Sequence, residues 1–416
     1  MFQRYFTKPY RFIPPYRGRV WCHLCRGLVP AYLRRRMGVA RWQFQGLDAL
    51  RSSMDRRAGI LLASNHCRWA DAAVLGLLGL QLKQYFYYVV SHHLFKQRRA
   101  MGWLMNRVGG YSILREGSDR ECLRTSARLL ADADRPVVVF PEGTWFRQND
   151  RLGPIQDGFC LILRHAARQA NRPVVVHPVA LKYWLLEDPR PILQSRLAAL
   201  ERRLSWQAQG HLDLISRIEK LACSLLAVKE MEYLDAVQTE PLDERIRHLS
   251  DHVVTQLEKT CLGKVRVGWI LERVRRLRQP LVRKLADGGD IDRVRAAQEA
   301  LDVLLFCENL SAHSMDYLHE RPSLERLTET VQRIEETVTD EMEIPVVPIG
   351  VTVAVGPALD VQSYPNLDRQ GLDPLSAEVA KGIQALLDGL LGDGPPVGWG
   401  CPSGRDQSTV ESCAAS

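Results

Sequence analysis

The sequence predicts a layered α/β domain that is interrupted by a helical insertion. In the first half of the chain, short apolar runs that resemble buried strands alternate with helical segments. This alternation is the pattern of an α/β layered domain. From about residue 191, apolar residues recur at spacings of three and four, which is typical of amphipathic helices. The chain has 416 residues, 46% of them hydrophobic, so it is long enough for two or three domains.

The first segment, 1–45, is basic and aromatic. Residues 1–57 contain thirteen Lys and Arg but only two acidic residues, whereas the whole chain has a net charge of +8. Interleaved rings and cations suit an anionic membrane surface, where rings lie at the headgroup level and cations meet lipid phosphates. The same composition also fits nucleic acid or a solvated basic flank. Of these alternatives we predict a membrane-associating helical segment, and no nucleic-acid partner.

The segment 46–190 is predicted to form the α/β core. Its four strand-like runs are short, continuous and rich in β-branched or aromatic residues, as expected for strands buried on both faces of a sheet. These runs lie at 59–64, 85–91, 136–140 and 173–181. Helical segments such as 119–134 and 158–170 separate them.

The second half of the chain is predicted to leave the core and return to it. Amphipathic helices fill the insertion 191–343, and turn signals such as Pro241 and Gly263 separate them. The segment 344–391 returns to the core as a strand followed by a helix. The tail 392–416 is rich in Gly, Pro and Ser, and we expect it to be disordered. No internal repeat is evident, and two successive domains are the alternative architecture.

The composition argues against a spanning or a zinc-stabilised protein. No apolar run approaches the roughly 20 residues that a spanning helix requires, and we expect no secretory leader after Met1. Ten cysteines are scattered along the chain. The lone CxxC at Cys22 and Cys25 lacks the second ligand pair that a structural zinc site needs. We therefore expect no metal, and a peripheral protein on the cytoplasmic side of the membrane.

His66 and Asp71 form the first candidate site. They lie five positions apart, where the apolar run 59–64 gives way to a predicted helix. A neutral imidazole is the usual side chain for taking a proton near pH 7, and a carboxylate on its other ring nitrogen fixes the tautomer. The spacing serves this purpose if His66 lies in the turn and Asp71 in the first helical turn. A helix-capping Asp beside an exposed His is the alternative.

Two further segments have the character of anion-binding loops. In the stretch "VVVFPEGTWF", an apolar strand ends at Pro141 and is followed by Glu142, Gly143 and Thr144. Such a loop exposes backbone N–H groups, which can hold a phosphate or an oxyanion. In "GGYSILRE", two glycines and a short apolar run precede Arg115, whose planar guanidinium suits phosphate. Alone, each segment also fits an ordinary turn or a surface ion pair.

Taken together and in order, these segments resemble the glycerophospholipid acyltransferase family, the PlsC-like group that includes lysophosphatidate acyltransferases. The resemblance covers roughly residues 40–185, with a return at 344–390, and rests on four blocks. The blocks are matched by Asn65, His66 and Asp71; by Gly109, Ile113 and Arg115; by Phe140, Pro141, Glu142, Gly143 and Thr144; and by Val176, Pro178 and Val179. It implies a glycerol-3-phosphate acyltransferase-like α/β domain.

The resemblance also implies a reaction and the residues that perform it. His66 would be the general base that takes the proton of an acceptor hydroxyl as its oxygen attacks an acyl thioester, and Asp71 would orient the ring. The acceptor it implies is 1-acylglycerol-3-phosphate, and the donor is acyl-CoA or acyl-carrier protein, with no bound cofactor. The residues implied for substrate binding are Asn65, Arg115, Glu142, Gly143 and Thr144.

Two positions depart from the family pattern. Trp145 replaces the Arg that usually ends the third block, and Arg147 lies two positions later. Arg147 is therefore a further candidate for binding the acceptor phosphate. Ser112 stands in the second block where an aromatic residue is common. These departures leave open a remodelling acyltransferase that acts on another lysolipid. A catalytically silent membrane scaffold is the remaining alternative.

Overall fold

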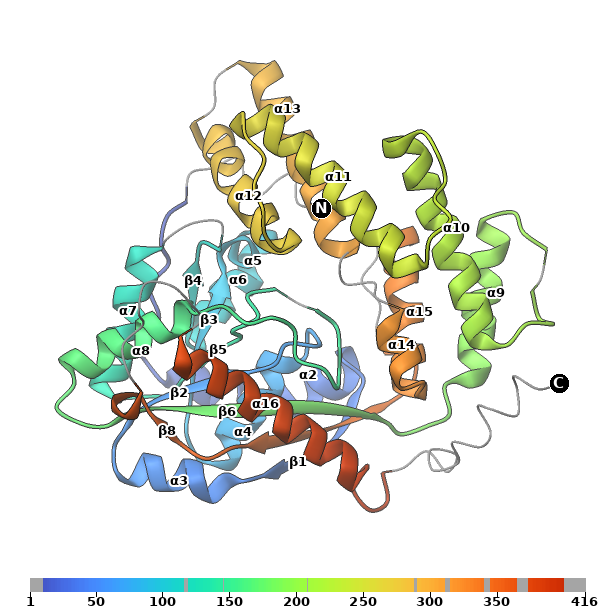
Figure 1. Ribbon diagram of the computed structural model, residues 1–416. Coiled ribbons are helices and arrows are strands. Elements are labelled where there is room, and N and C mark those ends of the chain that lie inside the picture. Colours follow the sequence, from blue (N-terminus) through green and yellow to red (C-terminus); the bar gives the residue numbers. More distant parts are fainter. Residues whose placement is uncertain are drawn as a thin grey trace. The chain divides into compact units, whose positions relative to one another are not determined.

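The computed structural model describes residues 10–115, 119–144, 146–207, 209–287, 290–310, 315–339, 345–364 and 373–399. Within these ranges the chain forms two compact units (Figure 1). The α/β unit contains residues 11–187 and 347–399. The helical unit contains residues 188–346. The architecture is thus mixed α/β, as the sequence predicts.

The α/β unit is built on a sheet that has eight strands among the described residues. The strands are β1 (Val39–Gln45), β2 (Gly59–Ser64), β3 (Tyr87–Ser91), β4 (Gly110–Ile113), β5 (Val137–Val139), β6 (Val174–Leu185), β7 (Ile349–Val355) and β8 (Leu359–Asp360). Their order is β1-β7-β6-β2-β5-β3-β4, and β8 pairs with β6. Neighbours are parallel except where β6 meets β7 and β8. All four strands predicted in the first half are found, and β6 continues four residues beyond its predicted end.

Helices cover both faces of this sheet (Figure 1). The helices of the unit are α1 (Val20–Cys25), α2 (Leu28–Arg36), α3 (Leu47–Asp55), α4 (Asp71–Gln81), α5 (His92–Gln97), α6 (Arg99–Arg107), α7 (Arg120–Asp132), α8 (Gly158–Gln169) and α16 (Pro374–Asp393); η2 (Val361–Ser363) is a short 3₁₀ turn. Apolar residues of α7, α8 and α16 form the main core with alternate residues of the strands, such as Leu61 and Ala63 of β2. None of the helices in the described ranges is long and apolar enough to cross a membrane.

The N-terminal segment is tied to the edge of the sheet before α1 begins. The N–H of Ile13 donates to Ser112 Oγ at 2.8 Å, and the N–H of Ser112 donates to the Ile13 carbonyl at 3.1 Å. The guanidinium of buried Arg135 donates to the carbonyls of Arg17 and Gly18. Ser112, which departs from the family pattern, therefore anchors this segment to β4.

The helical unit has its own apolar cores. Its helices are α9 (Arg190–Arg203), α10 (Leu214–Leu234), α11 (Leu242–Leu262), α12 (Ile270–Asp287), α13 (Ile291–Leu310), α14 (Asp316–Glu320) and α15 (Leu324–Thr339). One core joins α10, α11, α12 and α13, and a second joins α9, α10, α14 and α15. The amphipathic spacing predicted this helical content.

A structural repeat runs through α9 to α12, and the expectation of no internal repeat is wrong. A buried Glu near the end of one helix binds an Arg in the first turn of the next helix. The three pairs are Glu201–Arg217, Glu230–Arg245 and Glu258–Arg273, with closest N–O distances of 2.8, 2.7 and 2.9 Å. In each repeat the same Glu also accepts the N–H of the residue eight positions later. Each of the first three helices is followed by a residue with left-handed φ, namely Ser205, Asp235 and Gly263.

The helical unit is inserted between two adjacent strands. Antiparallel β6 and β7 pair Leu185 with Ile349, and the N–H of Leu186 donates to the Pro348 carbonyl at 3.0 Å. The chain therefore leaves the sheet and re-enters it on adjacent strands, so an insertion at this point does not interrupt the pairing of β6 with β7.

Candidate functional site

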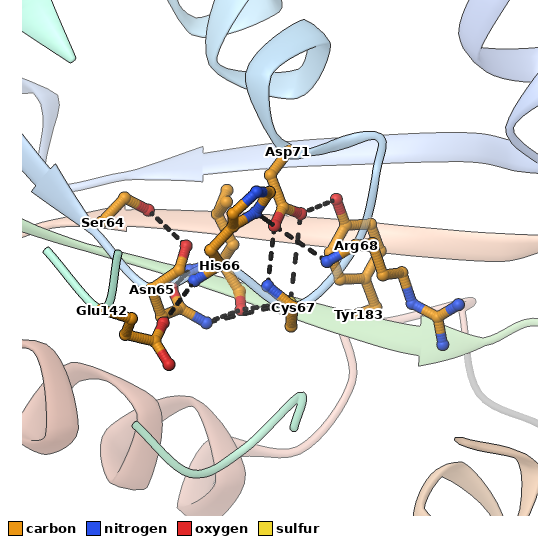
Figure 2. Close-up of polar contacts among 9 residues, drawn as sticks. Ser64, Asn65, His66, Cys67, Arg68, Asp71, Glu142 and Tyr183 are labelled. Atoms are coloured by element: carbon orange, nitrogen blue, oxygen red, sulfur yellow. Dashed lines mark hydrogen bonds and ion pairs between the residues drawn. The ribbon is translucent and has the colours of Figure 1, made fainter. Parts of the chain in front are cut away.

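The structure brings His66 and Asp71 together at the carboxyl end of β2 (Figure 2). β2 ends at Ser64, His66 lies in the turn, and Asp71 is the first residue of α4. Nδ1 of His66 lies 2.8 Å from Oδ2 of Asp71. The turn folds the carboxylate back onto the ring, which a continuous helix does not permit at a spacing of five.

Asp71 is fully buried and satisfied by several donors. The N–H groups of Cys67 and Arg68 donate to Oδ2 at 2.8 and 2.9 Å. The hydroxyl of Tyr183 donates to the other oxygen, Oδ1, at 2.6 Å. Donors of this kind stabilise an ionised carboxylate, and so does the N-terminal end of α4. Sequence reasoning missed Tyr183, because it lies 112 positions away from Asp71 and belongs to no block of the resemblance.

The ring of His66 is held on its face and remains accessible. It stacks on Phe140, with ring centroids 4.1 Å apart and an interplanar angle of 20°. Its side chain is 27% exposed, whereas that of Asp71 is 0% exposed. A ring that is held from one side by a buried carboxylate and is open to solvent can exchange a proton with a bound molecule.

Asn65 completes the sheet next to His66. β2 pairs with β6 as far as Ser64 and Val179, and no strand of the described ranges pairs with β6 beyond that point on this side. The amide of Asn65 accepts the N–H of Leu181 at 2.8 Å and donates to its carbonyl at 3.0 Å. Its amide group thus fixes the start of the His66 turn, and the predicted substrate contact of Asn65 stays a prediction.

Glu142 joins the loop that follows β5 to the His66 turn. Its Oε1 accepts the N–H of His66 at 2.6 Å, and its Oε2 accepts the N–H of Gly153 at 3.0 Å. Burial raises the pKa of this carboxyl group to about 8, against the lowering effect of the two N–H donors. These contacts position the backbone of His66, and its predicted binding of substrate stays a prediction.

A hydrogen bond joins the second block, at Arg115, to the third block, at Gly143. Nη1 of Arg115 donates to the carbonyl of Gly143 at 3.0 Å. Gly143 has a φ of +66°, and an added Cβ would lie 1.7 Å from Nε2 of Gln156. Glycine suits this position, because it adopts a left-handed φ without steric cost and leaves room for the end of the Gln156 side chain. Arg115, Gly143, Glu142 and His66 are thus linked in one chain of contacts.

The loop that follows β5 also contains the remaining predicted residues. Thr144 and Arg147 are both half-buried, and Arg147 has a left-handed φ of +58°. Trp145, whose substitution for Arg raised the question of acceptor identity, lies outside the described residues. No group of three or more His, Cys, Asp or Glu that could hold a metal ion occurs within the described ranges.

Comparison with known proteins identifies the class to which this fold and site belong. Residues 41–182 match the family model described as Acyltransferase. This segment contains the His66–Asp71 pair at the end of β2. This segment contains every candidate site residue predicted from the sequence. The chain therefore carries an acyltransferase domain of the PlsC-like glycerophospholipid acyltransferase family. No curated protein matches the chain.

Proposed function

We propose that this acyltransferase moves a fatty acyl group from an acyl thioester to the free hydroxyl of 1-acylglycerol-3-phosphate, giving phosphatidic acid. The observation that carries the proposal is the pairing of an accessible His66 ring with buried Asp71, at 2.8 Å. This pairing suits a general base, because the carboxylate fixes the tautomer and stabilises the imidazolium.

The proposed reaction is a direct attack without an acyl-enzyme. Nε2 of His66 removes the proton of the acceptor hydroxyl while the oxygen attacks the thioester carbonyl carbon. The tetrahedral oxyanion then collapses, the C–S bond breaks, and the thiolate takes the proton from the imidazolium. General-base action of this kind is worth roughly 10²- to 10⁴-fold. The thioester is supplied by acyl-CoA or by acyl-carrier protein, and no other cofactor enters the reaction.

The acceptor phosphate is proposed to bind at the loops that meet His66. Arg115 donates to the Gly143 carbonyl, and Glu142 of the same loop contacts the His66 N–H. The guanidinium groups of Arg115 and Arg147, with Thr144 and the backbone of the loop, supply donors for a phosphate monoester. A second candidate acceptor is another lysolipid, favoured by Trp145 in place of the usual Arg.

The N-terminal helices are proposed to hold the domain on an anionic membrane surface. Val20, Leu24 and Leu28 are each more than 60% exposed, and they recur at a spacing of four along α1 and α2. Trp21 packs edge-on against Trp103 of α6, with centroids 4.7 Å apart, and the segment carries a large excess of Arg. Exposed apolar residues among cations are the features of an interfacial segment. We place the protein peripherally, on the cytoplasmic side.

The test is acyl transfer by the purified protein from acyl-CoA and from acyl-carrier protein to a panel of lysolipids. Transfer to 1-acylglycerol-3-phosphate that disappears in His66→Ala supports both the reaction and the base. Transfer only to another lysolipid keeps the mechanism and changes the acceptor. Full activity in a folded His66→Ala variant would refute the role of His66. Absence of transfer from either donor would favour the scaffold alternative.

A further inference from the structure

Tyr183 contacts the dyad formed by His66 and Asp71, and the proposed reaction assigns it no role. It lies on β6, on the face of the sheet opposite the α7, α8 and α16 core, and its side chain is almost completely buried. His66 and the N–H groups of Cys67 and Arg68 all meet Oδ2 of Asp71, whereas the Tyr183 hydroxyl meets Oδ1. Cys67 Sγ lies farther from the same oxygen, at 4.0 Å.

The backbone that carries Tyr183 is fixed from the side. Beyond the end of β2, Asn149 takes the place of a neighbouring strand. It accepts the N–H of Tyr183 at 2.7 Å and donates to its carbonyl at 2.8 Å. The guanidinium of Arg68 lies over the tyrosine ring, 5.3 Å from its centroid. The hydroxyl therefore reaches Asp71 from a rigid strand and not from a mobile loop.

The hydroxyl is a neutral donor at physiological pH. Burial, first, and the nearby Asp71 raise the pKa of Tyr183 well above its usual value. The phenol thus stays protonated and donates a hydrogen bond to the carboxylate. The distance between the two oxygens is 2.6 Å, which is short for an O–H···O contact.

We propose that Tyr183 is a positioning residue for acyl transfer, which locks the Asp71 carboxylate and draws part of its charge away from His66. The inference rests on the proposed role of His66 as the base. A carboxylate with one oxygen held by Tyr183 cannot rotate, so its other oxygen stays aligned with Nδ1 of His66. The same bond weakens the hold of Asp71 on the imidazolium, which helps the ring to release its proton to the departing thiolate.

The test uses Tyr183→Phe, with Tyr111→Phe as the matched control. Tyr111 is also fully buried in the sheet, and its hydroxyl lies 2.7 Å from Ser126 Oγ, away from the dyad. Each variant removes one buried, hydrogen-bonded hydroxyl and keeps the ring. Both variants should therefore lose stability to a similar extent. Only Tyr183→Phe should alter the hydrogen bond between His66 and Asp71.

The first readout needs no activity. The proton between His66 Nδ1 and Asp71 gives a downfield NMR resonance, whose position follows the strength of that hydrogen bond. We expect Tyr183→Phe to move it further downfield, because Asp71 then retains more charge, and Tyr111→Phe to leave it in place. An unmoved resonance in Tyr183→Phe, or equal changes in both variants, would overturn the proposal.

The second readout is the pH dependence of acyl transfer. In Tyr183→Phe we expect the acid limb of kcat/KM to move up by about one pH unit, and kcat to fall about tenfold with KM nearly unchanged. Incorporation of 3-fluorotyrosine at position 183 retains the fold and strengthens the donor, so the acid limb should move in the opposite direction. Shifts of the same sign in the two variants would contradict the inference. If the wild-type protein transfers no acyl group, the proposed function fails, and the NMR readout still decides the role of Tyr183.

Discussion

At the residue scale, the site depends on side chains that hold the backbone as much as on the dyad itself. Asn65, Glu142 and Asn149 each use both ends of a carboxyl or amide group to bind two backbone groups. Each of these residues is almost fully buried. Removing one of them leaves backbone groups unpaired, which costs about 1–3 kcal/mol per buried group.

Glu142 makes stability depend on pH, because burial raises the pKa of its carboxyl group from 4.5 to about 8. Between these values the folded protein keeps a proton that the unfolded chain releases. The free energy of unfolding should therefore fall as pH rises through this window, by at most about 1.4 kcal/mol per pH unit. Glu142→Gln removes this slope. Urea unfolding of both proteins at pH 5, 6.5 and 8 measures it, and parallel pH curves would contradict the assignment.

Arg147 should contribute to acceptor binding if it replaces the usual Arg of the third block. A charge-assisted hydrogen bond is worth about 1.5–3 kcal/mol, so Arg147→Ala should raise KM for 1-acylglycerol-3-phosphate about 10- to 100-fold. The kcat value should change little. An acceptor without a phosphate monoester, such as lysophosphatidylcholine, serves as the control. An unchanged KM for the phosphate-bearing acceptor would place the contact elsewhere.

At this scale the sequence predicts contacts between residues that lie close together along the chain. The turn that joins His66 and Asp71 could be predicted, because both residues lie between one strand and one helix. The partners Tyr183, Leu181 and Gly153 could not, because sheet register and loop packing bring them to the site from 11 to 116 positions away. No spacing along the chain encodes these contacts.

At the scale of elements, the repeated Glu–Arg pairs should determine the stability of the helical unit. Arg245 is buried and binds Glu230, whose side chain is 0% exposed. Arg245→Leu leaves this buried carboxylate without its cationic partner, so we expect a loss of about 3–5 kcal/mol. Arg247 on the same helix is 74% exposed, and its replacement by Leu should cost less than about 0.5 kcal/mol. Chemical unfolding of both variants measures the difference, and equal effects would show that the buried pair has no special role.

The repeat also shows why the helices of the insertion could be predicted but their repeating arrangement could not. Apolar spacing identified the helices of the insertion, because each helix buries one face. The repeating unit is carried by charged residues, which sequence analysis assigns to the surface by default. Glu201, Glu230 and Glu258 recur at intervals of 29 and 28 residues, and this signal could have revealed the repeat.

At the scale of the whole molecule, membrane binding should depend on the exposed apolar residues of α1 and α2. Full burial of an apolar side chain is worth about 1.5–3 kcal/mol. Replacing Val20, Leu24 and Leu28 together by Ser should therefore weaken partition onto anionic vesicles by about 100-fold or more. Val228 of the helical unit is 64% exposed, and Val228→Ser is the matched control. Vesicle flotation measures the partition, and equal binding of all three proteins would remove the membrane role of the N-terminal helices.

The two units should fold separately, because each of the three apolar clusters that the structure describes draws its residues from one unit alone. The main core lies within 11–187 and 347–399, and the two helical cores lie within 188–346. Leu186 and Pro348 are joined by a hydrogen bond across adjacent strands, so an Asn-Gly turn can replace residues 187–347 and close a hairpin. We expect this shortened chain to unfold cooperatively and to keep kcat within about tenfold of the full-length value, since all candidate site residues remain. The same chain with His66→Ala should be inactive, which excludes a contaminating enzyme. A shortened chain that folds but transfers no acyl group would mean that the helical unit takes part in the reaction.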